Sequence, residues 1–190
     1  MAHACTILVI AATDRELAPA GECITVRCGV GPVEAAAATA AAIVLHRPAA
    51  IIHLGIAGAR RASGLVPPAL VIGSAAHYCD LAVPSALAPR VVIPDAQLLA
   101  AARRALPTAI VTAIGTSARV GGTSECDVEA MEGFAVLRAA QLAGILAIEV
   151  RAISNEIEDT DRARWHFEAA FAAIVAATPA LVAEVALCVR

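Results

Sequence analysis

Short runs rich in valine and isoleucine alternate along this chain with longer alanine-rich segments. Such runs are typical of strands buried on both faces, and the longer segments are typical of the helices that cover them. The alternation therefore predicts an α/β fold, in which a sheet is covered by helices on both faces. The runs predict strands over 6–12, 23–29, 49–55, 69–75, 109–115 and 145–153. The longer segments predict helices over 32–46, 95–106, about 131–143 and from about 162 onward.

Length and charge restrict the kind of protein further. The 190 residues predict one domain, 1–190, because no linker, repeat or charge block divides them and domains centre near ~100–150 residues. A net charge of −3 with only 14 lysines and arginines leaves no basic stripe. The 3% aromatic content leaves few rings to stack on bases. We therefore expect no nucleic acid partner.

The 59% hydrophobic content and the mean hydropathy of +0.76 raise the question of a membrane segment. A membrane span needs ~20 mostly apolar residues. The run over 35–45 is too short, and the run over 171–189 is interrupted by Pro179 and Glu184. Both runs are therefore expected to be core helices, with no membrane association. Thr178 and Pro179 resemble a cap and a first helical residue, so the last helix is expected to kink or restart there.

The first residues and the cysteines indicate in which cellular compartment the protein is expected. The opening "MAHACTILVIAATDRE" lacks the positively charged start of an export signal. The six cysteines show no paired metal spacing and mostly lie in apolar runs, where a thiol behaves as a small hydrophobic group. The sequence thus predicts a cytoplasmic protein without a zinc site or a disulfide framework.

Ligands of such sheets bind at the carboxyl ends of the strands, so the residues that follow each strand are candidates for a site. "CGVGPVEAA" (28–36) has closely spaced glycines, which either let backbone N–H groups reach an anion or form a plain tight turn. The chain has neither a G-x-G-x-x-G nor a G-x-x-x-x-G-K-[ST] pattern. "LGIAGA" (54–59) offers small residues for a substrate or for close packing. Taken alone, Glu16 and Asn155 are best explained as turn residues.

The same pieces form a recognisable pattern when they are taken in order: "VIAATDRE", "CGVGPVEAA", "LGIAGA", "HYCD", "EAMEGFA" and "EVRAISN". The pattern resembles the nucleoside phosphorylase and nucleosidase superfamily, which includes methylthioadenosine/S-adenosylhomocysteine nucleosidase, and it covers most of the chain. Gly133 after "ME", Asn155 after "RAIS" and the trailing "DTDRARW" look most like the futalosine hydrolases of that superfamily. The resemblance implies a three-layer α/β/α fold with a mixed, mostly parallel central sheet.

The resemblance also implies an N-glycosyl hydrolase that needs no metal or organic cofactor. Breaking this bond builds positive charge on the ribose and negative charge on the departing purine. Glu16 stands where the resembled nucleosidases have the carboxylate that deprotonates the attacking water. Glu132 matches the glutamate that accepts hydrogen bonds from the ribose hydroxyls, and Met131 would place its thioether against the sugar. Glu129 is expected to have a structural or supporting role, on the same helix as Glu132 if the helix extends that far.

Asn155 implies which base is released. The adenine-releasing nucleosidases resembled here carry an aspartate at this position, whereas an asparagine can donate to a 6-oxo group and accept from N7–H, which favours hypoxanthine. Ile56, Ala57 and Gly58 are expected to contact the substrate, and Gly133 is expected to leave room beside it. The expected small-molecule partner is therefore a purine nucleoside, and the resemblance implies a homodimer.

Several alternatives stay open. "HLGIAGA" lacks the arginine that phosphorylases commonly carry at this turn, which favours hydrolysis, although Arg60 and Arg61 follow immediately. Enzymatic alternatives are a methylthioadenosine/S-adenosylhomocysteine nucleosidase and a purine nucleoside phosphorylase. A non-catalytic nucleoside-binding protein is the alternative from another class. It is kept because the segments 16–29 and 119–129 are shorter than in the resembled enzymes and Cys79 replaces a histidine.

Overall fold

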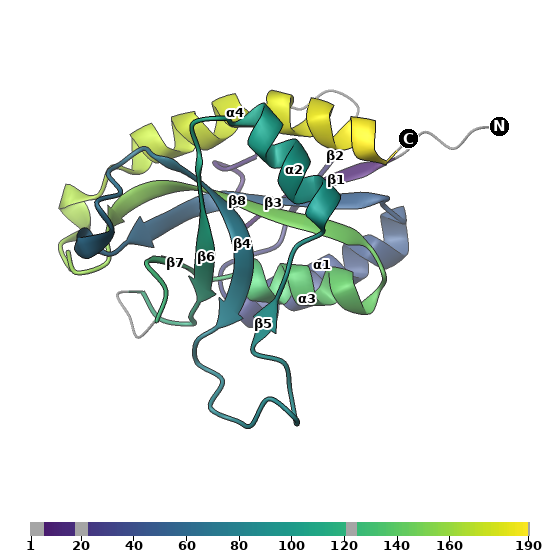
Figure 1. Ribbon diagram of the computed structural model, residues 1–190, viewed down its shortest axis with the longest axis horizontal. Coiled ribbons are helices and arrows are strands. Elements are labelled where there is room, and N and C mark those ends of the chain that lie inside the picture. Colours follow the sequence, from purple (N-terminus) through teal and green to yellow (C-terminus); the bar gives the residue numbers. More distant parts are fainter. Residues whose placement is uncertain (1–5, 18–22, 121–124, 190) are drawn as a thin grey trace.

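The computed structural model describes residues 6–17, 23–120 and 125–189, and its strands form a single sheet (Figure 1). The strands are β1 (Ile7–Ala11), β2 (Ile24–Arg27), β3 (Ala50–Ala59), β4 (Leu70–Tyr78), β5 (Val91–Val92), β6 (Ile110–Thr116), β7 (Val128–Ala130) and β8 (Leu146–Glu156). Their order is β2, β1, β3, β7, β6, β4, β5, with β8 paired to both β3 and β4. The pairs β3–β7, β4–β5 and β4–β8 are antiparallel, and the other pairs are parallel. The sheet is thus mixed and mostly parallel, as expected.

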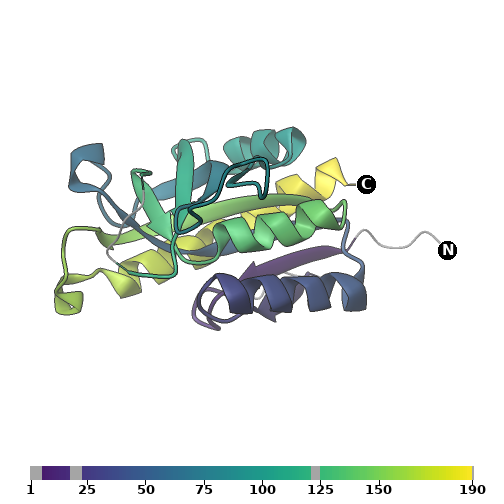
Figure 2. The same ribbon diagram turned by 90° about the horizontal axis from the view of Figure 1, so that it is seen from below.

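Helices cover both faces of the sheet, which confirms the predicted three layers. The helices are α1 (Pro32–His46), α2 (Ala96–Ala105), α3 (Gly133–Leu142) and α4 (Phe167–Cys188), with the 3-10 turns η1 (Arg61–Ser63) and η2 (Arg162–Arg164). Figure 2 shows α1 and α3 on one face and α2 and α4 on the other. Successive strand residues point to opposite faces, so Ile7 and Val9 join the core under α2 and α4 while Leu8 and Ile10 join the core under α1 and α3. Burial on both faces is the reason that these runs are apolar throughout.

β3, β4 and β8 extend past their predicted ends, and the extra residues of β3 and β8 belong to the site. β3 continues to Ala59 and β8 continues to Glu156, so "GIAGA" and "ISN" lie on strands and not in turns. The two strands stay paired to their ends, where Gly58 lies opposite Asn155. β7 pairs with the same end of β3, placing Gly58 opposite Glu129 on its other side. Pairing on both sides keeps the end of β3 extended.

α4 is continuous from its first residue to its last, so the expected restart at Thr178 and Pro179 is wrong. Pro179 lies inside the helix, where it has no backbone N–H to donate. The hydroxyl of Thr178 does not cap a new helix but donates to the carbonyl oxygen of Ile174, 2.9 Å away. Apolar side chains on both sides of the proline are buried against the sheet, and this packing holds the two halves together.

By length and composition, α4 is the helix, among those described, that is long and apolar enough to cross a membrane. In this fold it packs along the sheet and against α2 (Figure 1). Ile174, Leu181 and Val185 are fully buried there. α4 is therefore a core helix of this fold, as expected for this segment.

Candidate active site

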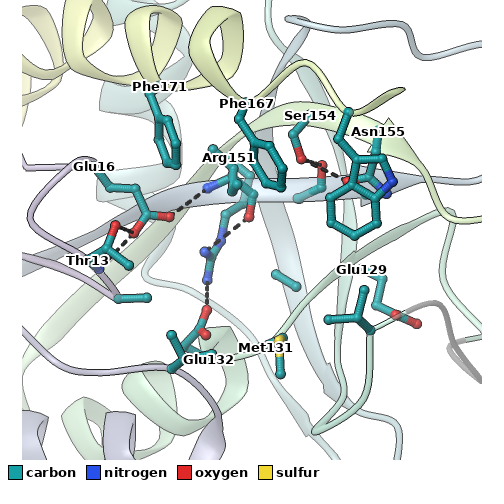
Figure 3. Close-up of a pocket in the computed structure, with 18 of the residues that line it drawn as sticks. Thr13, Glu16, Glu129, Met131, Glu132, Arg151, Ser154, Asn155, Phe167 and Phe171 are labelled. Atoms are coloured by element: carbon teal, nitrogen blue, oxygen red, sulfur yellow. Dashed lines mark hydrogen bonds and ion pairs between the residues drawn. The ribbon is translucent and has the colours of Figure 1, made fainter. Parts of the chain in front are cut away.

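A pocket of about 310 Å³ lies at the carboxyl ends of β1, β3 and β8, beside the start of α3 (Figure 3). Its size is at the lower end of the usual range for small-molecule sites. The structure brings together at this pocket seven residues that the sequence predicts for the site, namely Glu16, Ile56, Ala57, Gly58, Met131, Glu132 and Asn155, whereas Gly133 does not line it.

Glu16 lies in the turn that follows β1, and hydrogen bonds fix both oxygens of its carboxylate. Oε2 accepts from the backbone N–H of Thr13 at 2.8 Å and from its hydroxyl at 2.7 Å. Oε1 accepts from the backbone N–H of Ile56 at 3.1 Å. Glu16 is only 3% exposed. Because an ionised carboxylate can accept about four hydrogen bonds, Glu16 has capacity for one more donor in the pocket, such as a water molecule.

The small residues of β3 make room for side chains from other elements. The backbone N–H of Ile56 donates to the Glu16 carboxylate and so helps to position that side chain. A Cβ at Gly58 would lie 3.1 Å from Nδ2 of Asn155 and 3.1 Å from Cγ1 of Ile157. The absence of a side chain at Gly58 therefore lets Asn155 occupy this place.

Glu132 immediately precedes α3 and is held by groups from two other elements. Oε1 accepts from the backbone N–H of Gly31 at 3.1 Å, and Oε2 accepts from Nη2 of Arg151 at 3.3 Å. Gly31 has a φ of 94°, a conformation that favours glycine, and it directly precedes α1. The glycine-rich turn does approach an anion, and this anion is the Glu132 carboxylate.

Glu129 is not on the same helix as Glu132, which corrects one expectation from the sequence. Glu129 belongs to β7, where it pairs with Gly58 and Gly115. The chain leaves the strand after Ala130, and α3 begins only at Gly133. The two glutamates therefore lie on different sides of the pocket, as Figure 3 shows.

Asn155 is 8% exposed, and its amide is oriented by two polar neighbours. Its Oδ1 lies 2.8 Å from the hydroxyl of Ser154, and its Nδ2 donates to the carbonyl oxygen of Glu156 at 2.9 Å. The amide keeps one N–H and one lone pair for further hydrogen bonds. These are the two groups that the expected role at a 6-oxopurine requires.

Arg151 on β8 lines the pocket and was not predicted from the sequence. Its Nε donates to Oε1 of Glu149 at 2.8 Å, and its Nη2 lies 2.5 Å from Nε2 of His53. His53 Nδ1 lies 3.1 Å from the carbonyl of Ile10, so Nδ1 carries the proton and Nε2 accepts from the arginine. Burial, followed by the Arg151 charge, holds the pKa of His53 well below its usual value. His53 is therefore neutral.

The guanidinium of Arg151 is buried but stays charged. Burial by itself lowers the pKa of Arg151, while the charges of Glu149 and Glu132 outweigh this effect and raise that pKa above its ordinary value. Gly55 on β3 leaves space for it, because a Cβ there would lie 2.1 Å from Nη1. Charged residues alternating with apolar ones in "IEVRA" were the available signal for this buried pair.

Aromatic rings around the start of α4 form another wall that the sequence did not reveal. Trp165, Phe167 and Phe171 all line the pocket. The Trp165 and Phe167 rings are 5.4 Å apart between centroids, and Nε1 of Trp165 donates to the carbonyl oxygen of Asp159 at 2.9 Å. Aromatic faces of this kind suit the apolar parts of a nucleoside.

Comparison with known families agrees with this geometry. The family model described as "Phosphorylase superfamily" matches residues 15–187, which is most of the chain. The chain therefore belongs to the phosphorylase superfamily.

Within this superfamily the chain is a homologue of futalosine hydrolase. The futalosine hydrolase of Streptomyces coelicolor is 34% identical over 175 residues, covering 77% of this chain and 72% of that protein. The native structure of futalosine hydrolase from Helicobacter pylori has a TM-score of 0.83 at 15% identity, covering 96% of this chain and 97% of that one. The methylthioadenosine/S-adenosylhomocysteine nucleosidase of Colwellia psychrerythraea, solved in complex with adenine, has a TM-score of 0.80 at 20% identity, covering 98% and 96%. These structures share the fold.

Proposed function

We propose that this chain is a nucleosidase that hydrolyses the N-glycosidic bond of futalosine and releases hypoxanthine and dehypoxanthine futalosine, as a step of menaquinone biosynthesis. The observation that carries the proposal is the arrangement of Glu16, Glu132 and Asn155 around one pocket. The identity with the Streptomyces enzyme supports the same substrate.

Each of these groups meets one demand of the reaction. Glu16 takes a proton from the water that attacks the anomeric carbon. Glu132 accepts hydrogen bonds from the ribose hydroxyls, and its negative charge stabilises the positive charge that develops on the ribose. Asn155 donates to the 6-oxo group of the departing hypoxanthine and accepts from its N7–H. Met131 also lines the pocket, and we assign its sulfur to a contact with the sugar.

The arginines near the pocket favour water over phosphate as the nucleophile. Arg61 forms an ion pair on the surface, and Arg60 donates to a backbone carbonyl. Arg151 is engaged by two carboxylates, and the exposed Arg162 lies over the ring of Trp165. Phosphate binding commonly uses arginines directed at the anion, and these arginines are already paired or stacked.

The first test is the release of a free base. The purified protein is incubated with futalosine, inosine, methylthioadenosine and adenosine, with and without inorganic phosphate, and the released base is identified. We expect hypoxanthine from futalosine without phosphate. A strict requirement for phosphate would indicate a phosphorylase, release of adenine alone would indicate an adenine-releasing nucleosidase, and no release from any nucleoside would favour a binding protein.

Asn155→Asp is expected to move the base preference toward 6-aminopurines. The new carboxylate would face the 6-oxo acceptor of hypoxanthine, and an unpaired buried polar group costs about 1–3 kcal/mol. Since about 1.4 kcal/mol corresponds to a tenfold change, the ratio of kcat/KM values for futalosine and its 6-amino counterpart should fall about tenfold or more. An unchanged ratio would show that Asn155 does not distinguish the bases.

We also propose that the chain forms a homodimer through the groove between α1 and α3. The groove is lined mainly by apolar side chains, including Val33, Val44 and Leu142, which are 76%, 78% and 71% exposed. Exposed apolar patches of this kind are typical of protein interfaces. Sedimentation should show a dimer, and Leu142→Glu should dissociate it, whereas Val66→Glu, at another exposed apolar residue, should not. A monomeric wild type would rule this interface out.

The proposed reaction uses no metal or organic cofactor, because water activation and charge stabilisation are assigned to side chains. In the part of the chain that the structure describes, no group of three or more histidine, cysteine or acidic residues is arranged to hold a metal ion. The described cysteines Cys23, Cys28 and Cys188 form no disulfide, which suits the reducing cytoplasm. Full activity after dialysis against a metal chelator is the corresponding check.

A further inference from the structure

Glu149 on β8 is a fully buried carboxyl group to which the reaction above gives no role. Its Oε1 accepts from Nε of Arg151 at 2.8 Å. Its Oε2 and the hydroxyl oxygen of Thr39 are the buried side-chain atoms, among described residues, that have no hydrogen-bond partner. An unpaired carboxylate oxygen is costly to bury, so its place in the fold needs a reason.

The first residue of α3 is shaped around this carboxyl group. A Cβ at Gly133 would lie 2.1 Å from Oε2 of Glu149 and 2.2 Å from its Oε1. No side chain larger than hydrogen fits at Gly133 while Glu149 is in place. The sequence suggests that Gly133 leaves room beside the substrate, but Glu149 fills the room that this glycine provides.

Arg151 links Glu149 to the two carboxylates that face the pocket. Its Nη2 lies 3.3 Å from Oε2 of Glu132. Its Nη1 is near Glu16, because a Cβ at Gly55 would lie 2.1 Å from that nitrogen and 3.1 Å from Oε1 of Glu16. By itself, the positive charge of Arg151 would weaken the negative potential that Glu16 and Glu132 provide for a ribose cation.

We propose that Glu149 is a positioning residue that holds Arg151 and balances its positive charge, so that Glu16 and Glu132 present their negative charge to the ribose. The effect on rate rests on the proposed nucleosidase function. The effect on the binding of a positively charged ligand does not depend on turnover. Gly133 is part of the same arrangement, because its lack of a side chain provides the space for Glu149.

The charge of Glu149 should make the rate depend on pH. Burial is the main reason that the pKa of Glu149 is raised; the Arg151 charge opposes this and Glu132 adds to it. Of the other facing elements, β3 presents the neutral His53 and β4 presents Gly73. As the pH falls through this raised pKa, Glu149 becomes neutral and the potential at the ribose weakens. We therefore expect an acid limb in the profile of kcat against pH whose position shifts in Glu149→Gln.

Glu149→Gln tests the charge while it keeps the shape and the acceptor for Arg151. The probes are inosine, which is neutral, and a purine nucleoside analogue in which a protonated nitrogen replaces the ribose ring oxygen. Calorimetry should show that the variant loses about tenfold in affinity for the cationic analogue and much less for inosine. Equal changes for both ligands, or no change, would overturn the proposal. Release of no base by the wild type would refute the proposed function, while the ratio of the two affinities would still test Glu149.

Gly133→Ala and Glu149→Val separate packing from charge. Gly133→Ala alone should lower the melting temperature, because the new methyl group overlaps the Glu149 carboxyl. Adding Glu149→Val removes this overlap but leaves Nε of the buried Arg151 without its acceptor, so the melting temperature should recover only in part. Affinity for the cationic analogue should stay about tenfold below that of the wild type, because the charge is still missing. Recovery of both properties in the double variant would mean that Glu149 has only a structural role.

Discussion

Glu16→Gln is expected to lower turnover about 10²–10⁴-fold, the usual contribution of a general base, with a much smaller effect on nucleoside binding. An amide cannot take the proton of the attacking water. It still offers an oxygen to one of the donors that now hold Glu16, the groups of Thr13 and the N–H of Ile56. The variant should therefore keep the shape of the pocket and lose the chemical step.

Turnover and binding can be measured separately for this variant. Hypoxanthine release gives kcat, and the fluorescence of Trp165, the one tryptophan of the chain and part of the pocket wall, reports binding. Asp14→Asn is the matched control, because Asp14 lies in the same turn but pairs with Arg27 at the surface, 3.2 Å away. The control should keep normal turnover. Near-normal turnover in Glu16→Gln would remove Glu16 from the mechanism.

The alternation of apolar and alanine-rich segments was sufficient to predict the layers of this fold because both faces of the sheet are covered. Helix α1 begins and ends at the predicted residues, Pro32 and His46. β5 and β7 were missed, since they span two and three residues and no period can be recognised over so short a length. The continuity of α4 was missed because its packing against the sheet outweighs the local preference of Pro179 to begin a helix.

Some residues of the site could be predicted from the sequence, and others could be identified only from the fold. Residues in recognisable motifs, such as Glu16 and Asn155, were predicted and lie at the pocket. Arg151 and Glu149 were missed because their pairing within one strand does not show that they reach the site. The other partners of Arg151, Glu132 and His53, come from distant segments. The same applies to the aromatic wall, which exists only because the start of α4 lies beside the end of β8, where the N–H of His166 donates to the carbonyl oxygen of Ser154.

Glu132→Gln is expected to lower kcat/KM roughly 10- to 100-fold, because hydrogen bonds to charged groups contribute about 1.5–3 kcal/mol. The amide loses the negative charge beside the ribose. It also turns an NH₂ group toward either the N–H of Gly31 or the guanidinium of Arg151, both of which are donors. Melting temperatures of variant and wild type show how much of the loss comes from altered packing and how much from the site.

Glu129→Gln is the matched variant, because Glu129 lines the same pocket and is also buried, at 7% exposed. It stands on β7, on a different side of the pocket from Glu132 and Arg151 (Figure 3). Its charge is therefore directed away from the groups that bind the ribose, and the substitution should change kcat/KM much less. Both variants are measured with futalosine at the same pH. Equal losses would mean that the pocket responds to its total negative charge, and the assignment of the ribose to Glu132 alone would then be wrong.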